Sequence, residues 1–403
     1  MALAVAIMNE PARCNPCWLY DQPVTGPAVS IQTTLHTLEF KLYPNKEQER
    51  TLSRWLSKCC WLYNRALEMR SKAYKRRKES VRYNSQQHWL TGLRERIESV
   101  RLVPVGFARD ALRRVDRGMK AFFRRCKAGE KKVGFPRFRS WRRYNSLECL
   151  ALGNYMDGNS IRVPCLGSVH ARGQFGEVGK QKLLRVVRRA HGWYAQVLIE
   201  QRKPEPLPET GNECGLDLGL TSFATLDSGE QIGNPRIFRK AEKKIRRNNK
   251  RLSRAKRGSN RRQVALQRLR RTHEKVQRQR RGFCHRLSRD LVNRFDRIAI
   301  ENLNVKGLAR TRLAKSVHDA AWSMFTSILI VKAENAGRTV VQVDPRGTSQ
   351  TCPECGEVVA KKLSERTHRC EGCGFGCDRD QAAAMVIRQR AFRPARGEAM
   401  KPR

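Results

Sequence analysis

The sequence predicts a multidomain α/β protein whose two halves differ in architecture. In the amino-terminal half, short alternating segments lie on both sides of a long helical region, and this order predicts a small β-barrel with inserted helices. In the carboxyl-terminal half strands and helices alternate, which is typical of an α/β layer domain. Two CxxC pairs near the carboxyl end predict a zinc ribbon inserted into that domain. With 403 residues, 39% of them hydrophobic, the chain can build two or three separate cores.

The composition points to a polyanionic partner. The chain has 83 Lys and Arg against 37 Asp and Glu, and self-repulsion at a formal net charge of +46 favours binding to nucleic acid. An anionic membrane surface is the rival, but no segment approaches the roughly 20 apolar residues that cross a bilayer. The short apolar run at the amino terminus lacks a preceding basic segment, unlike a secretory signal. Because the 14 cysteines include CxxC pairs, we expect a cytoplasmic protein with metal-binding thiols.

Residues 1–35 are expected to form a flexible leader, since four prolines interrupt them. Cys14 and Cys17 in this leader are half of a zinc site with no evident partner pair, so metal binding there stays open. From His36 apolar and polar residues alternate until Pro44, as in a half-buried strand.

Helical spacing of apolar residues then predicts a helical region over 51–129, with a second long segment from about Asn84 to Cys126. Its arginines are expected to point outward, either as an ordinary solvated face or as an RNA-binding face. Short strand-like segments between about Asn159 and Glu200 complete the predicted barrel, which comprises 36–50 and 130–203.

An aromatic and basic run covers residues 131–146, KKVGFPRFRSWRRYNS. Its aromatic residues are candidates for stacking on nucleic-acid bases while the basic residues meet phosphates; they are Phe135, Phe138, Trp141 and Tyr144. The alternative is an ordinary loop that its aromatic side chains anchor to a core.

A proline-rich linker, QRKPEPLPET, separates the halves at 201–210. After it we expect a strand hairpin from ECGLDLGLTSFATLDSGEQI and a long basic helix pair between Arg239 and Arg289. A strand RIAIENL, a helix from about Ser316 to Gly337, a strand RTVVQV and a last helix from Asp380 follow.

Three acidic residues stand at the ends of predicted elements in a chain with few acids. Asp217 lies between two glycines in GLDLGL, Glu301 ends an apolar strand, and Asp380 begins the last helix. Carboxylates that converge on one rim of a sheet would bind Mg²⁺, and two such ions about 4 Å apart hydrolyse phosphodiesters. Taken singly, each acid also fits a structural role as a turn residue, a salt-bridge partner or a helix-start residue.

Four cysteines form two knuckles separated by fourteen residues, Cys352 with Cys355 and Cys370 with Cys373. Four thiolates make a closed tetrahedral site, so we expect structural rather than catalytic zinc. Cys377 and His368 lie close in sequence and leave the identity of the fourth ligand open.

The order of these motifs resembles the transposon-encoded TnpB proteins and the compact type V CRISPR effectors related to them. The resemblance covers roughly residues 36–390 and is carried by FKLYPNKEQ, FFRR, GFPRFRS, GLDLGL, IAIENLNVKGL, DPRGTSQTCPECG, CEGCG and DRDQAAAMVI.

This resemblance implies an RNA-guided DNA endonuclease that reads a short motif beside its target. The implied partners are a guide RNA and double-stranded target DNA, with the basic helices of 239–289 lining their channel. We expect one copy on a large RNA, with a dimer as the alternative, in a prokaryotic cytosol or nucleoid. The implied cofactors are two Mg²⁺ ions at Asp217, Glu301 and Asp380, with Mn²⁺ as a substitute, and structural Zn²⁺.

The implied domains are a wedge-like barrel (36–50 and 130–203) with an inserted helical recognition domain (51–129). An RNase H-like, RuvC-type nuclease domain follows (204–345 and 378–392), with an inserted zinc ribbon that contacts target nucleic acid (346–377) and a basic tail (393–403).

One departure from the family pattern concerns position 382. Relatives usually carry Asn there, two residues after the third acid, whereas this chain has Ala382. A guided DNA-binding repressor with weak or absent cleavage is therefore one alternative, and a non-guided transposon-associated DNA-binding protein is another. Because all three acids remain, the resemblance favours an active nuclease.

Overall fold

The computed structural model describes residues 33–130, 133–150, 153–173, 179–308, 314–361 and 365–392. The predicted leader with Cys14 and Cys17, except for its last three residues, and the basic tail lie outside these ranges. All of the described residues belong to one unit, which begins at Thr33. Within the described ranges, no helix is both long and apolar enough to cross a bilayer.

The amino-terminal half contains a seven-stranded antiparallel sheet with the order β2-β6-β7-β1-β5-β4-β3. As predicted, the strand near residue 40 pairs with the later strands, and Phe40 lies opposite Ala195. The sheet fits the predicted small barrel as a half-barrel, because β2 and β3 stand at the two ends of the strand order in the described residues. The strands are β1 (Thr33–Leu42), β2 (Ser146–Leu150), β3 (Met156–Asp157), β4 (Ser160–Val163), β5 (Gly167–Arg172), β6 (Lys180–Arg189) and β7 (Gly192–Arg202).

Helices connect β1 to β2: α1 (Lys46–Arg77), α2 (Tyr83–Arg96), α3 (Glu98–Arg101) and α4 (Val105–Lys127). A capping box begins α1, because the Asn45 side chain accepts from the Gln48 N–H and Gln48 accepts from the Asn45 N–H. The region predicted from Asn84 to Cys126 is divided into separate helices. Pro104 precedes α4, and proline disfavours helical backbone in the residue before it.

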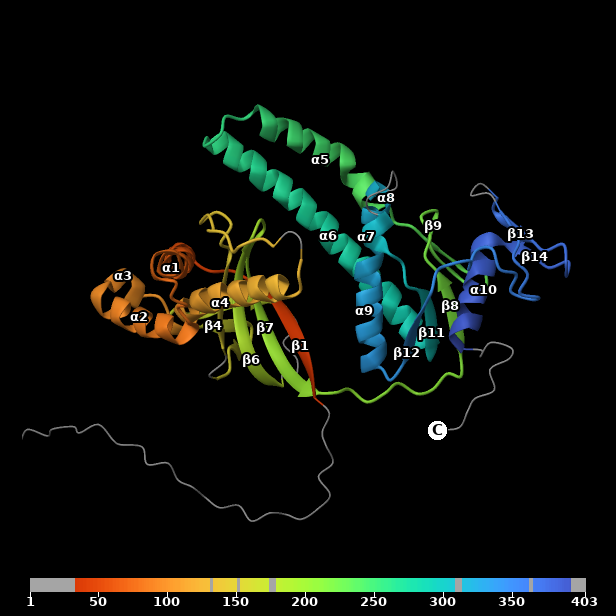
Figure 1. Ribbon diagram of the computed structural model, residues 1–403, viewed down its shortest axis with the longest axis horizontal. Helices are drawn as coiled ribbons and strands as arrows, with labels where there is room; N and C mark the ends of the chain where they lie inside the picture. The colour runs from red at the N-terminus through yellow and green to blue at the C-terminus, as the bar shows by residue number, and fades with distance from the viewer. Residues whose placement is uncertain are drawn as a thin grey trace, which may run out of the picture. The chain divides into compact units, whose positions relative to one another are not determined.

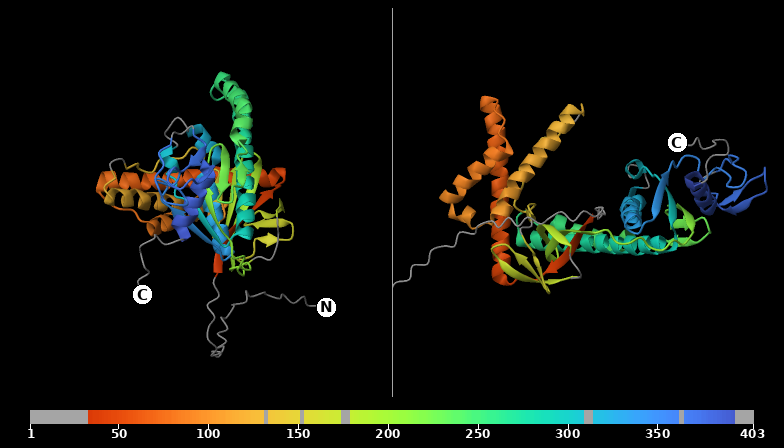
Figure 2. Two further views of the ribbon diagram at one scale, coloured as in Figure 1. Left: turned by 90° about the vertical axis from the view of Figure 1, so that its right-hand side faces the viewer. Right: turned by 90° about the horizontal axis from the view of Figure 1, so that it is seen from below.

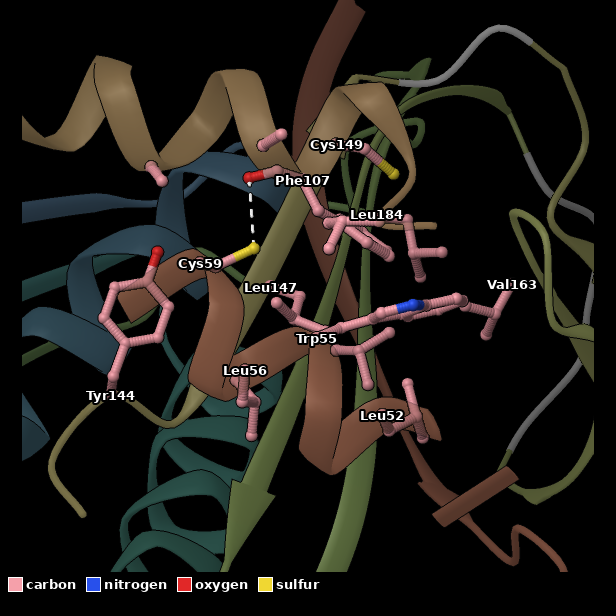
Figure 3. Close-up of a cluster of buried hydrophobic side chains, with 14 of the residues drawn as sticks. Leu52, Trp55, Leu56, Cys59, Phe107, Tyr144, Leu147, Cys149, Val163 and Leu184 are labelled. Atoms are coloured by element: carbon pink, nitrogen blue, oxygen red, sulfur yellow. Dashed lines mark hydrogen bonds between the residues drawn. The ribbon is translucent and has the colours of Figure 1, made fainter. Parts of the chain in front are cut away.

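Figure 3 shows the core that the helices share with the sheet. Trp55 of α1 packs near Phe107 of α4, with ring centroids 5.8 Å apart. The Cys59 thiol donates to the Phe107 carbonyl at 3.7 Å, and burial raises the pKa of this thiol well above its usual range. Cys59 is therefore a structural side chain, as its place on the predicted apolar face indicates.

The second sheet has the order β10-β9-β8-β11-β12, in which β8, β11 and β12 are parallel and β9 and β10 are antiparallel. Its strands are β8 (Glu213–Asp217), β9 (Ser222–Leu226), β10 (Gln231–Gly233), β11 (Arg297–Glu301) and β12 (Thr339–Val343). The helices of this half are α5 (Ile237–Arg254), α6 (Asn260–Arg294), α7 (Val305–Leu308), α8 (Ala314–Ala320), α9 (Trp322–Asn335) and α10 (Arg379–Phe392).

Helices cover both faces of this sheet (Figure 1). Ile298 and Ile300 of β11 belong to the core shared with α6 and α9, whereas Ala299 packs with Ile387 of α10. Alternate residues of a strand face opposite sides, so β11 is buried on both. This explains the uninterrupted apolar run in the sequence.

Of two predictions about helices in this half, the first is wrong in one respect and the second is confirmed. The helix predicted from Ser316 to Gly337 is broken at Ala321, whose φ of 59° lies in the left-handed region, so α8 and α9 are separate. The basic helix pair is confirmed as α5 and α6. A small antiparallel pair, β13 (Thr367–Arg369) and β14 (Gly376–Asp378), lies in the cysteine-rich segment before α10.

Candidate functional site

The three predicted acids lie at one end of the second sheet. Asp217 is the last residue of β8 and Glu301 the last of β11. These strands are parallel neighbours with Leu216 opposite Ile300, so the two acids occupy the next register position. Asp380 lies in the first turn of α10, which packs against β8, β9, β11 and β12. The fold therefore gathers residues separated by more than 160 positions of sequence.

Gly215 allows α10 to approach β8. A Cβ atom at this position would lie 2.0 Å from the Ala384 carbonyl oxygen and 2.9 Å from the Arg388 backbone nitrogen. Both are backbone atoms of α10, so no side-chain rotation would relieve the clash. The small residue two positions before Asp217 therefore permits a close approach, and the approaching group is the helix that carries Asp380.

Asp227, at the end of the β9 strand, was missed by sequence reasoning. Its carboxylate accepts from the Gly215 N–H at 3.1 Å and from the Arg388 guanidinium at 2.5 Å. The Gln381 side chain donates to the Asp227 carbonyl at 3.3 Å. Asp227 therefore ties α10 to β8 and β9, and the only sequence signal was a carboxylate in a strand rich in apolar residues.

Asp378 caps α10. Its Oδ1 accepts from the backbone N–H groups of Asp380 at 2.9 Å and Gln381 at 3.2 Å. Such a cap satisfies donors that the helix itself leaves unpaired. The two neighbouring aspartates thus have different roles: one holds the helix start, and the other is available to a ligand.

The pKa values of the three acids are all raised, because burial outweighs the effect of nearby arginines such as Arg366, which lies 4.0 Å from Asp380. Burial, together with the negative charges of Glu301 and Asp380, raises the pKa of Asp217 to about 8. Burial and the charge of Asp378 raise the pKa of Asp380. Burial also raises the pKa of Glu301, against the hydrogen bond that Thr348 donates to it at 2.5 Å. Each carboxylate is less stable in its charged form than it is in water, and a divalent cation would reverse this.

The donor set fits Mg²⁺, which prefers carboxylate oxygens. The three acids do not, however, form a group with all ligand atoms within 4.8 Å of one another; among the described residues only the four cysteines do. The negative charges of Glu301 and Asp380 nevertheless act on Asp217 and raise its pKa.

Gly215→Ala is expected to lower thermal stability and cleavage activity together. The new methyl group must push α10 away from β8, and overpacking of this kind costs about 1–3 kcal/mol. Thermal unfolding and cleavage rate measure the two effects. Gly233→Ala, in β10 of the same sheet with nothing within 4 Å of the added Cβ, is the matched control. Equal stability and activity of the two variants would contradict the close approach described above.

The cysteine site is assembled as the sequence predicts. Cys352 and Cys373 have their Sγ atoms 3.6 Å apart, and Cys355 and Cys370 have theirs 3.5 Å apart. A tetrahedral zinc with bonds of about 2.3 Å requires sulfurs about 3.8 Å apart, so the four side chains fit the ion. Burial opposes ionisation of Cys352, but backbone N–H groups of Cys355 and Glu354 lower the pKa of its thiol to about 6.

Cys377 and His368 do not join this group. The Cys377 thiol donates to the Asp378 carbonyl at 3.2 Å. The His368 ring is fully buried, contacts the Lys361 amine through Nδ1, and packs near Phe375. The set of four cysteines is therefore complete without a substitute ligand.

A basic groove lies between α5 and α6. Its volume is about 1130 Å³, and its lining includes Lys240, Lys244, Arg247, Arg251, Arg268, Arg271, Lys275, Arg278 and Arg286. The Asn248 side chain donates to Thr272 at 3.0 Å between the helices, a buried polar contact that joins the pair. Cations on both walls suit a phosphate backbone.

The aromatic run divides into two groups. Phe135, Phe138 and Trp141 are exposed, whereas Tyr144 is fully buried beneath Arg114. Stacking on bases is wrong for Tyr144, which anchors the loop to the core. Stacking on bases remains a prediction for the three exposed rings.

Sequence models of known families match three parts of the chain. Residues 196–312 match the sequence model of the family OrfB_IS605, described as "Probable transposase". Residues 322–387 match the "Cas12f1-like, TNB domain", and residues 34–79 match the helix-turn-helix domain HTH_OrfB_IS605.

Curated relatives align over most of the chain. A protein of Streptomyces pristinaespiralis, provisionally named an RNA-guided DNA endonuclease, is 29% identical over 367 residues, which are 89% of each chain. The Escherichia coli K12 protein provisionally named RNA-guided DNA endonuclease InsQ is 27% identical over 374 residues, 88% of this chain and 91% of its own.

Among solved structures, the protein in the "Cas12f1-sgRNA-target DNA complex" aligns with a TM-score of 0.56. The alignment covers 88% of this chain and 98% of that one at 14% identity. At this identity the match establishes a shared fold.

Proposed function

Because the chain belongs to the TnpB family, we propose that it is an RNA-guided DNA endonuclease that hydrolyses phosphodiesters at Asp217, Glu301 and Asp380. The single observation that carries this proposal is the shared end of the sheet. Two strand ends and one helix start present three carboxylates there, and two of them raise the pKa of the third. Two relatives that align over most of the chain bear the same provisional activity in their names.

In this proposal the three acids hold Mg²⁺, with Mn²⁺ as a substitute. Bound ions of this kind activate a water and stabilise the leaving oxygen of the phosphodiester. The chain's own contribution is position and charge: Asp217 and Glu301 stand on rigid strand ends, and Asp378 and Asp227 hold the helix that carries Asp380. Thr348 orients Glu301 through its hydroxyl.

The proposed domains are those that the resemblance to the family implies. A RuvC-type, RNase H-like nuclease domain comprises 204–345 and 378–392, and the zinc ribbon of 346–377 contacts target nucleic acid. The wedge (36–50 and 130–203) and the recognition helices (51–129) hold the guide and read the motif beside the target. The basic groove between α5 and α6 supports a guide–target channel, because its cations line both walls.

Ala382 supports the second candidate, a guided binder with little cleavage. Ala382 is buried on α10, and its methyl group cannot supply the amide that relatives carry at this position. The two candidates differ in product formation and agree in target binding.

The test uses the full chain purified with its RNA. The RNA is sequenced, and DNA that carries the matching target is incubated with the complex in Mg²⁺, in Mn²⁺ and in EDTA. We expect cleavage only with matching RNA and a divalent ion. Target binding with no product after long incubation in either metal would favour the guided binder. Duplex binding that needs no RNA and depends only on salt would contradict both candidates.

A further inference from the structure

A hollow lies between α1, α4 and the loop that follows α4. Its volume is about 980 Å³, and its walls come from the carboxyl-terminal part of α1, the last turns of α4 and residues 135–138. The right-hand view of Figure 2 shows the two helices diverging towards their carboxyl ends. The hollow belongs neither to the acid cluster nor to the zinc site.

Large aromatic side chains in this hollow are exposed. Tyr74 is 61% exposed, Phe123 is 52% exposed and Phe138 is 63% exposed. Phe122 joins two further rings edge to face, with centroids 5.2 Å from Phe123 and 5.3 Å from Phe135. Exposed apolar surface that is gathered in one place marks an interaction site, because a protein without a partner would gain free energy by burying that surface.

The loop that carries Phe135 and Phe138 is fixed to the helices on both sides. The Asn64 side chain donates to the Arg139 carbonyl at 2.9 Å and accepts from the Arg139 N–H at 2.8 Å. Tyr63 donates to the Arg137 carbonyl at 3.3 Å, and Arg125 donates to the Gly134 carbonyl at 3.0 Å. The loop backbone beside Phe135 and Phe138 is thus held in place before any partner binds, which reduces the entropy cost of binding.

Four basic residues and two acids, Glu68 and Glu79, line the hollow beside the rings. Lys75 and Arg137 line the hollow and form no ion pair within the described part of the chain, whereas Lys72 pairs with Glu68 at 2.6 Å. Flat exposed rings beside unpaired cations complement a base that is attached to a phosphate. Bases in the middle of a duplex do not present their faces, so the complementary ligand is unpaired.

We propose that this hollow binds unpaired nucleotides of the guide RNA, whose bases stack on Tyr74, Phe123 and Phe138 while Lys75 and Arg137 meet the phosphates. The inference rests on the proposed function in one respect, that an RNA is the resident partner. In the proposed function RNA is the resident partner and DNA the substrate, which favours RNA as the ligand of this hollow. Single-stranded RNA is commonly recognised by such stacking.

The test measures affinity of the full, RNA-free chain for a labelled oligoadenylate RNA of about 12 nucleotides, within the site sizes known for stacking platforms. Phe123→Ala and Phe138→Ala are each expected to weaken binding about 5- to 100-fold, the effect of one lost stacking contact. Phe138→Trp should retain affinity. Neither alanine variant should change the slope of log affinity against log salt, because no cation is lost. Lys75→Ala should reduce that slope by about 0.7.

Trp61→Ala is the matched control, since Trp61 is also an exposed aromatic on α1 with a lysine, Lys58, over its ring. It should bind like the unchanged protein. Because Phe123 and Phe138 are exposed, their substitution should leave the fold intact, and circular dichroism checks this.

Three results would overturn the inference: unchanged affinity in both alanine variants, equal losses for RNA and a blunt RNA duplex, or tighter binding of the matching DNA strand than of RNA. A change in sedimentation with unchanged RNA affinity would instead assign the hollow to contact between copies of the chain. Cleavage is not a readout here, so failure of the nuclease proposal and failure of this inference are distinguishable.

Discussion

Asp217→Asn is expected to reduce target cleavage by the RNA-loaded protein at least about 1,000-fold, with target binding unchanged. Asp217 is the acid that interacts with both of the others, and it stands on a strand end that cannot shift to compensate. An amide is nearly the same size and neutral, so the fold is retained while a negative metal ligand is lost. Single-turnover cleavage and filter binding on the same preparations measure the two quantities.

The control is Asp290→Asn, which removes an exposed carboxylate that pairs with Arg294 on α6 at 3.1 Å. Its cleavage rate should match that of the unchanged protein, because exposed pairs one helical turn apart contribute little to stability. Cleavage by Asp217→Asn at more than a tenth of the normal rate would show that the acid is not a catalytic ligand.

The same substitution is expected to change how stability depends on pH. An unfolded aspartate titrates near 3.9, whereas burial and two neighbouring acids raise the pKa of folded Asp217 to about 8. Between these values the folded protein binds more protons than the unfolded one, so the free energy of unfolding falls as pH rises from about 4 to about 8. Thermal unfolding in EDTA at pH 5 and pH 8 should show this decline, and Asp217→Asn should reduce it.

Cys352→Ser is expected to abolish zinc binding and to reduce cleavage about 100-fold. The Cys352 side chain is buried among the four sulfurs, and the segment around it has too little core to fold without a metal. The ribbon leads directly through β14 into α10, so its unfolding would displace Asp380, and a misplacement of about 1 Å can cost about 100-fold in rate. Metal analysis, limited proteolysis and cleavage rates measure the consequences.

Cys377→Ser is the matched control, because Cys377 lies in the same segment and outside the four-sulfur group. It should keep its zinc and its cleavage rate. A zinc-free Cys352→Ser protein that cleaves normally would show that the ribbon and the acid cluster are independent, despite their adjacency in sequence.

Elements that depend on local spacing could be predicted from the sequence. The apolar faces of α1, α5 and α6 follow from helical periodicity, and the cap at Asp378 follows from an acid placed just before an alanine-rich run. The cysteine site followed from spacing alone, since two knuckles can enclose one ion in few arrangements. Predictions of where a helix ends were less accurate. Ala321 and Pro104 interrupt helical segments that periodicity alone treats as continuous.

The sequence was sufficient to name Asp217, Glu301 and Asp380 as candidates, because motif context and position at the ends of elements are local properties. Their meeting at one end of a sheet is a tertiary fact, decided by parallel pairing of β8 with β11 and by the approach of α10 that Gly215 permits. The role of Asp227 could not be predicted for the same reason, since the residues that donate to its carboxylate lie 12 and 161 positions away in the sequence. The hollow between α1 and α4 was likewise decided by packing: periodicity assigns residues to helix faces, but only the tertiary fold determines which faces remain uncovered.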